Sequence, residues 1–90
     1  MDVFDSASPV DHPRVGVIVP RYKHRVVDRN VVKRRIREAI RREILPRLVE
    51  RNLMVDVLVR ARREAYGASF VTLRDELVGW FDRRWSHASS

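Results

Sequence analysis

The sequence predicts a small α/β protein of the α+β kind, a two-layer sandwich with two helices packed on a small mixed sheet. Three observations lead to this fold class. Residues 14–19 and 53–61 are rich in β-branched side chains, as strands are. The segment between them has helical periodicity, so that the two strands can lie parallel as neighbours. A second amphipathic segment follows and can pack on the same sheet face.

The 90-residue chain has the length of one domain with one modest core. We therefore treat residues 1–90 as a single domain, with a variable N-terminal segment over 1–13 and a frayed tail over 86–90. Val3 and Phe4 form a short apolar pair that is read as an edge strand. Residues 14–19 form the next strand, between Pro13 and Pro20, and a polar, cationic loop follows over 20–25.

Residues 26–45 are predicted to form the first helix. Apolar side chains recur there at i, i+3 and i+4 spacing and define one seam: Val32, Ile36, Ala39, Ile40 and Ile44. Pro46 lacks an N–H and should kink or stop this helix.

Residues 53–61 form the clearest strand, in which side chains alternate between two faces. Val55, Val57 and Val59 point one way, and the other face carries Met54, Asp56, Leu58 and Arg60. Residues 62–67 are predicted as a loop, and Ser69 as the N-cap of a helix that runs to about Arg84. Its apolar stripe is interpreted as core: Phe70, Leu73, Leu77, Trp80 and Phe81.

Positive charge is concentrated in one segment. The chain has 19 Lys and Arg against 12 Asp and Glu, a net charge of +7. Residues 29–51 hold nine of the basic and three of the acidic side chains, whereas residues 1–13 hold no Lys or Arg. Like charges at helical spacing repel one another, so a polyanion is the expected partner of such a helix.

Several classes of function are excluded or disfavoured. The chain has no cysteine, and no apolar run approaches the ~18 residues needed to cross a bilayer, so we expect a cytoplasmic protein without membrane contact. Its three histidines have no partners at metal-ligand spacing, and no nucleophile motif or glycine-rich loop is present. We therefore predict no catalytic residue and no metal ligand in the protein. Glu38 is interpreted as a side chain whose negative charge reduces the repulsion between neighbouring arginines of the same helix.

Residues 29–38 also resemble a known motif. Val15-Gly16-Val17-Ile18-Val19, a basic loop, and then Arg29-Asn30-x-x-Lys33-Arg34-x-x-Arg37-Glu38 resemble the protein subunit of bacterial ribonuclease P. Asp56-Val57-Leu58-Val59-Arg60-Ala61-Arg62 is similar to the last strand of that family, and the resemblance covers roughly residues 14–83. It implies a fold like domain 2 of ribosomal protein S5.

The resemblance implies an enzyme subunit whose RNA partner carries the chemistry. The ribonuclease P RNA would hydrolyse the phosphodiester with magnesium ions (Mg2+) held by RNA and phosphates. The protein would bind this RNA and the 5′ leader of precursor tRNA. The implied RNA-binding residues are Arg21, Tyr22, Lys23, Arg29, Asn30, Lys33, Arg34, Arg37, Arg41 and Arg60. Tyr22 would either stack on a leader base or cover the sheet edge, and the residues leave both interpretations open.

Three departures from the family pattern are visible. Val31 stands where the motif usually has Arg, and His24-Arg25-Val26 replaces a small Gly-Asn-Ala turn. Val3-Phe4 corresponds to the family's second strand, so we expect the usual first helix and first strand to be missing. A truncated sheet would expose apolar surface and favour a homodimer.

Two other functions remain open. A small basic mRNA-cleaving toxin has a similar size and charge, although such toxins usually place their chemistry on a sheet late in the chain. A non-catalytic RNA- or DNA-binding module would need no particular RNA partner.

Overall fold

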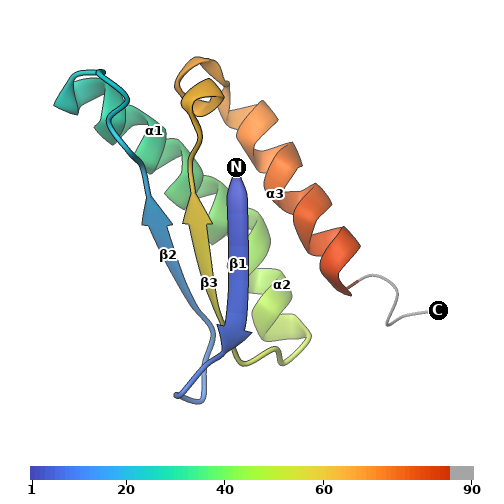
Figure 1. Ribbon diagram of the computed structural model, residues 1–90. Helices are drawn as coiled ribbons and strands as arrows, with labels where there is room; N and C mark the ends of the chain where they lie inside the picture. Colours follow the sequence, from blue (N-terminus) through green and yellow to red (C-terminus); the bar gives the residue numbers. More distant parts are fainter. Residues whose placement is uncertain (86–90) are drawn as a thin grey trace.

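The computed structural model of the protein describes residues 1–85, so the predicted tail over 86–90 lies outside the described residues. The elements follow in the order β1 (Asp2–Ala7), β2 (Arg14–Ile18), α1 (Val26–Ala39), η1 (Ile40–Ile44), α2 (Leu45–Glu50), β3 (Val55–Arg60), η2 (Arg63–Gly67) and α3 (Phe70–Trp85). The predicted α+β architecture is confirmed: a small mixed sheet forms one layer and the helices form the other (Figure 1).

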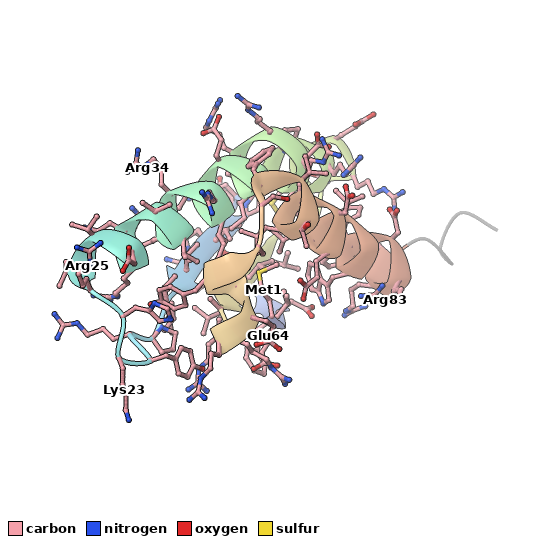
Figure 2. The ribbon with its side chains drawn as sticks, turned by 90° about the horizontal axis from the view of Figure 1, so that it is seen from above. Met1, Lys23, Arg25, Arg34, Glu64 and Arg83 are labelled. Carbon is pink, nitrogen blue, oxygen red and sulfur yellow. The ribbon has the colours of Figure 1, made fainter. Side chains whose placement is uncertain are left out.

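Within residues 1–85 the sheet has three strands in the order β1-β3-β2. β3 is parallel to β2, as predicted, and antiparallel to β1. Strand alternation then sorts the side chains. Val57 and Val59 are buried against the helices, whereas Phe4, Ile18 and Leu58 are exposed on the opposite face. The helices lie on one side of this sheet (Figures 1 and 2), which leaves the other face open.

The predicted end of the first helix at Leu45 is wrong, because the helical path continues to Glu50. Residues 40–44 form a π-helical turn in which the N–H of Leu45 donates to the carbonyl of Ile40. Pro46 then occupies the first turn of α2, where a missing N–H costs little. The wider π-helical turn thus accommodates Pro46, and the proline does not end the helical path.

α2 ends with hydrogen bonds that replace the lost helical pattern. Asn52 adopts a left-handed conformation with φ 56°. The N–H of Leu53 donates to the carbonyl of Leu48 at 2.9 Å, and that of Asn52 to the carbonyl of Val49 at 3.0 Å. This is a Schellman ending with asparagine in the place that glycine usually takes. It turns the chain directly into β3.

The core lies between the sheet and the helices, and the predicted seam of the first helix is buried throughout. Ser69 caps α3 as predicted, since its Oγ accepts a hydrogen bond from the N–H of Thr72 at 3.2 Å. The apolar stripe of α3 is only partly buried: Leu73, Leu77 and Phe81 are enclosed, whereas Phe70 and Trp80 are half-buried at the margin. The predicted loop over 62–67 contains the short 3-10 helix η2.

Candidate nucleic-acid interface

A cationic cleft of about 690 Å³ crosses one end of the open sheet face. Three arginines line it, and each comes from a different element: Arg21 follows β2, Arg29 lies on α1, and Arg60 ends β3. The other lining residues are Phe4, Ile18, Val19, Pro20 and Leu58. The fold therefore brings together three predicted RNA-binding residues that are up to 39 positions apart in the sequence.

Hydrogen bonding orients one of these arginines. The Nε of Arg29 donates to the carbonyl oxygen of Val19 at 2.7 Å, in a half-buried position. The bond ties the first turn of α1 to the end of β2. Because a guanidinium is planar, this contact also sets the direction of its remaining N–H groups.

The floor of the cleft is apolar, and the sequence reasoning did not assign it a role. The exposed fractions of Phe4, Ile18 and Leu58 are 56%, 45% and 39%. Phe4 is paired with Leu58 in the register of β1 and β3. Strand alternation was the available signal, because it already placed Leu58 on the face opposite the buried valines. An open apolar floor with cationic walls suits an unpaired nucleotide, whose bases stack and whose phosphates are charged.

Most of the predicted residues on α1, together with Arg41 on η1, form a second surface, which we call the outer ridge. At about 100° per residue these positions fall on one stripe of the helical path, beside the buried seam. Lys33 is half-buried at the near edge, and the exposed members are Asn30, Arg34, Arg37 and Arg41. Figure 2 shows Arg34 and Lys23 pointing to opposite sides of the molecule. The ten predicted residues are thus divided between the cleft, the outer ridge and the turn that carries Tyr22 and Lys23.

Three further arginines of the basic segment contact α3 or its approach: Arg35, Arg42 and Arg51, whose Nη1 donates to the carbonyl of Trp85 at 3.2 Å. Nη1 of Arg35 donates to the carbonyl of Ala68 at 3.0 Å. The guanidinium of Arg42 lies over the Phe70 ring, 5.5 Å from its centroid. These side chains link α1, η1 and the end of α2 to α3 and its approach. Part of the positive charge from which we predicted a polyanion partner therefore makes contacts within the protein.

Glu38 relieves charge repulsion within the segment, as predicted. It accepts hydrogen bonds from Arg41, one of them 3.2 Å from Nε, and from Nε of Arg42 at 2.8 Å. The hydrogen bonds with Arg41, and its positive charge, hold the pKa of Glu38 below the ordinary value. Glu38 thus offsets some of the positive charge of the outer ridge where Arg41 lies.

Tyr22 lies beside the cleft and is not among its lining residues. The guanidinium of Arg63 sits over the Tyr22 ring at 5.3 Å from the centroid. The Tyr22 and Tyr66 rings also form a T-shaped pair, with centroids 6.4 Å apart and planes at 87°. Base stacking by Tyr22 stays a prediction, and a base would have to share the ring with these neighbours.

The part of the chain that the structure describes contains no group of three or more His, Asp or Glu side chains that could hold a metal ion. Among residues 1–85, no helix is both long and apolar enough to cross a membrane. The described residues present a cationic cleft with an apolar floor, beside a cationic ridge.

Fold and surface together define a small basic α+β protein that is suited to a polyanionic partner. Comparison with known families identifies the family to which the protein belongs. The family model described as Ribonuclease P matches residues 3–84, so the chain belongs to the ribonuclease P protein family.

Relatives and solved structures agree with this placement. Ribonuclease P protein components of Brucella suis and Brucella melitensis are 35% identical over 77 residues, which cover 81% of this chain and 50% of each relative. The chain therefore spans about half the length of the curated relatives it matches. The Staphylococcus aureus RNase P protein superposes with a TM-score of 0.71 at 26% identity, over 92% of this chain and 72% of that one. The Thermotoga maritima RNase P protein gives 0.69 at 25% identity, over 90% and 74%.

Proposed function

We propose that this protein is the protein subunit of ribonuclease P. In this role it binds the ribonuclease P RNA and the 5′ leader of precursor tRNA, and assists removal of the leader during tRNA maturation in the cytoplasm. Family membership supports the subunit role. The observation that carries the assignment of the leader site is the convergence of Arg21, Arg29 and Arg60 on one cleft with an apolar floor.

The cleft suits a single strand better than a duplex. Guanidinium groups on its walls would neutralise phosphates, and this gives an affinity that falls steeply with salt. Exposed Phe4 and Leu58 offer a surface for unpaired bases, and such stacking tolerates any base sequence. A leader differs in sequence from one tRNA precursor to the next, so a site of this kind would serve many substrates.

The outer ridge supplies a separate surface for the RNA subunit. Its exposed guanidinium groups lie on the continuous helical path of α1 and η1, which would lie along the RNA backbone and position the cleft next to the cleavage site. In this proposal the RNA carries the hydrolysis, with magnesium ions held by RNA and phosphates. The protein contributes affinity and orientation.

A cleavage assay at low magnesium tests the proposal. Precursor tRNA is incubated with the source organism's ribonuclease P RNA alone, with the protein alone, and with both. We expect leader removal to require the RNA and to be accelerated by the protein. Tight RNA binding without acceleration would contradict the subunit role and favour a non-catalytic binding module.

A further arm, in which the protein alone is incubated with an mRNA, addresses the mRNA-cleaving alternative. A mutant of the S. aureus RNase P protein with defective mRNA degradation activity superposes on this chain with a TM-score of 0.65 at 28% identity, over 83% of this chain and 60% of that one. Cleavage of an mRNA by the present protein without its RNA partner would support that second activity. The homodimer expected from the sequence stays a prediction, and sedimentation velocity tests it.

A further inference from the structure

The turn between β2 and α1 has an unusual backbone. Tyr22 and Lys23 have φ values of 49° and 69°, in the left-handed region that non-glycine residues seldom occupy. The N–H of His24 closes the turn on the carbonyl of Arg21 at 2.8 Å. Two successive left-handed residues without glycine persist only where their surroundings hold them.

Tyr66, from η2, contacts the chain on both sides of this turn. Before the turn, its hydroxyl donates to the carbonyl of Pro20 at 2.6 Å. After the turn, the His24 ring stacks on the Tyr66 ring, with centroids 3.8 Å apart and planes at 6°. Within the turn, the Tyr22 and Tyr66 rings pack in a T-shaped arrangement. One half-buried side chain therefore holds the entrance, the middle and the exit of the turn.

Arg21 belongs to this turn and lines the cationic cleft. Its position follows from the path of the backbone between Pro20 and His24. Arg63, also from η2, adds a contact by lying over the Tyr22 ring. The segment between β3 and α3 thus contacts the turn that carries a cleft arginine.

We propose that Tyr66 is a positioning residue for RNA binding, which acts by holding the Pro20–His24 turn so that Arg21 faces the cleft. The inference rests on the function proposed above and extends it to a residue outside the basic motif. Its physical basis is preorganisation: a turn that is already ordered loses less conformational freedom when RNA binds. Without Tyr66, RNA would have to select the left-handed turn from a broader ensemble.

The test is a double-mutant cycle between Tyr66 and Arg21. Binding of a fluorescein-labelled oligouridylate is followed by fluorescence anisotropy for the wild type, Tyr66→Ala, Arg21→Ala and the double variant. We expect Tyr66→Ala to weaken binding about tenfold, and to have a much smaller effect when Arg21 is already Ala. Tyr66→Phe keeps the stacking and loses the hydrogen bond, so it should fall between the wild type and Tyr66→Ala.

Controls separate positioning from stability. Leu77→Val changes a buried residue of α3 that lies in the core and does not line the cleft. It should lower stability without changing RNA affinity. If Tyr66→Ala does not fold, Tyr66→Phe and His24→Ala carry the test, because each removes one contact to the turn.

Two results would overturn the inference. RNA affinity that is unchanged in Tyr66→Ala would show that the turn needs no support. Fully additive effects of the Tyr66 and Arg21 substitutions would show that Tyr66 does not act through Arg21. If Arg21→Ala itself leaves binding unchanged, the assignment of the cleft under the proposed function fails, and this outcome is distinct from the other two.

Discussion

Arg29 on α1 donates a hydrogen bond from its Nε to the carbonyl oxygen of Val19, 2.7 Å away at the end of β2. The same guanidinium lines the cationic cleft. One side chain therefore joins the helix to the sheet and also presents positive charge to the proposed RNA site. Arg34, on the outer ridge, is exposed and points away from the sheet (Figure 2). This difference separates two arginines that look equivalent in the motif.

Replacement of Arg29 by Ala should therefore lower both stability and RNA affinity. Loss of the half-buried hydrogen bond should cost about 1 kcal/mol of the free energy of unfolding. Loss of one phosphate contact should reduce the slope of log affinity against log salt by about 0.7 for a single strand. Urea denaturation and salt-dependent binding of single-stranded RNA measure the two effects.

Arg34→Ala is the matched control for Arg29→Ala, because it removes an exposed arginine of the same helix. It should leave the free energy of unfolding within about 0.5 kcal/mol of the wild-type value while weakening binding to ribonuclease P RNA. If the slope of log affinity against log salt is unchanged in both variants, the basic helix is not part of the RNA interface. Equal destabilisation by both would contradict the structural role of Arg29.

Phe4→Ala should weaken binding of single-stranded RNA by about 1–3 kcal/mol, because the ring is an exposed part of the cleft floor on which a base can stack. Stability should change little, since 56% of this residue is exposed. Val71→Ala is a suitable control: Val71 is also apolar and exposed, but it lies on α3 and does not line the cleft. Fluorescence anisotropy should show reduced affinity for the first variant alone.

Acid should weaken the ion pair between Arg14 and Asp56. Arg14 donates from Nε to Asp56 Oδ1 at 2.9 Å and from Nη2 to Oδ2 at 2.7 Å. The hydrogen bond with Arg14 holds the pKa of Asp56 below its ordinary value of 3.8. A carboxylate whose pKa is lower in the folded than in the unfolded state stabilises the fold above the unfolded pKa. This contribution is lost as the pH falls through the folded pKa.

The free energy of unfolding should accordingly decline less steeply below about pH 4 in Asp56→Asn than in the wild type. Arg14→Ala should have the same effect over the same pH range. Urea denaturation at a series of pH values measures both curves. Some decline should remain, because hydrogen bonds with arginines also lower the pKa values of Asp2 and Glu38. Variant curves parallel to that of the wild type would show that the pair makes no contribution in solution.

Phe81→Ala should destabilise the fold by about 3–5 kcal/mol, because the ring is fully enclosed and its removal leaves a cavity. Trp80→Ala should cost roughly 1–2 kcal/mol, since Trp80 is only half-buried at the margin of the core. Urea denaturation gives both values, and Phe81→Leu serves if the alanine variant does not fold. A larger cost for Trp80 would reverse this assignment of core and margin.

Side-chain periodicity explains which parts of the fold were predictable. The seam from Val32 to Ile44 and the alternation around Val57 are repeating patterns, and both were confirmed by burial. The end of the first helix was not predictable in this way. Proline normally stops a helix, and its accommodation depends on a π-helical turn whose buried residues, Ile40 and Ile44, are held by the tertiary core. η2 was missed because a single short turn has no period to detect.

The site was predictable only in part, for a related reason. The motif named Arg29 and Arg34 together, but which of them faces the cleft depends on how α1 rotates against the sheet. The apolar floor was missed because an exposed Phe4 has meaning only once its neighbour Leu58 is known. Tyr66 was missed because its contacts with Pro20 and His24 join segments more than 40 positions apart.

The one-sided sheet has a consequence for how this protein tolerates change. Along β3, Val57 and Val59 face the core while Leu58 and Arg60 face the cleft, so neighbouring positions meet different physical requirements. Changes at Val57 or Val59 should therefore alter the stability of the fold, and changes at Leu58 or Arg60 should alter the proposed RNA site. Every second residue of β3 can therefore be substituted to change ligand preference without changing the core that stabilises the fold.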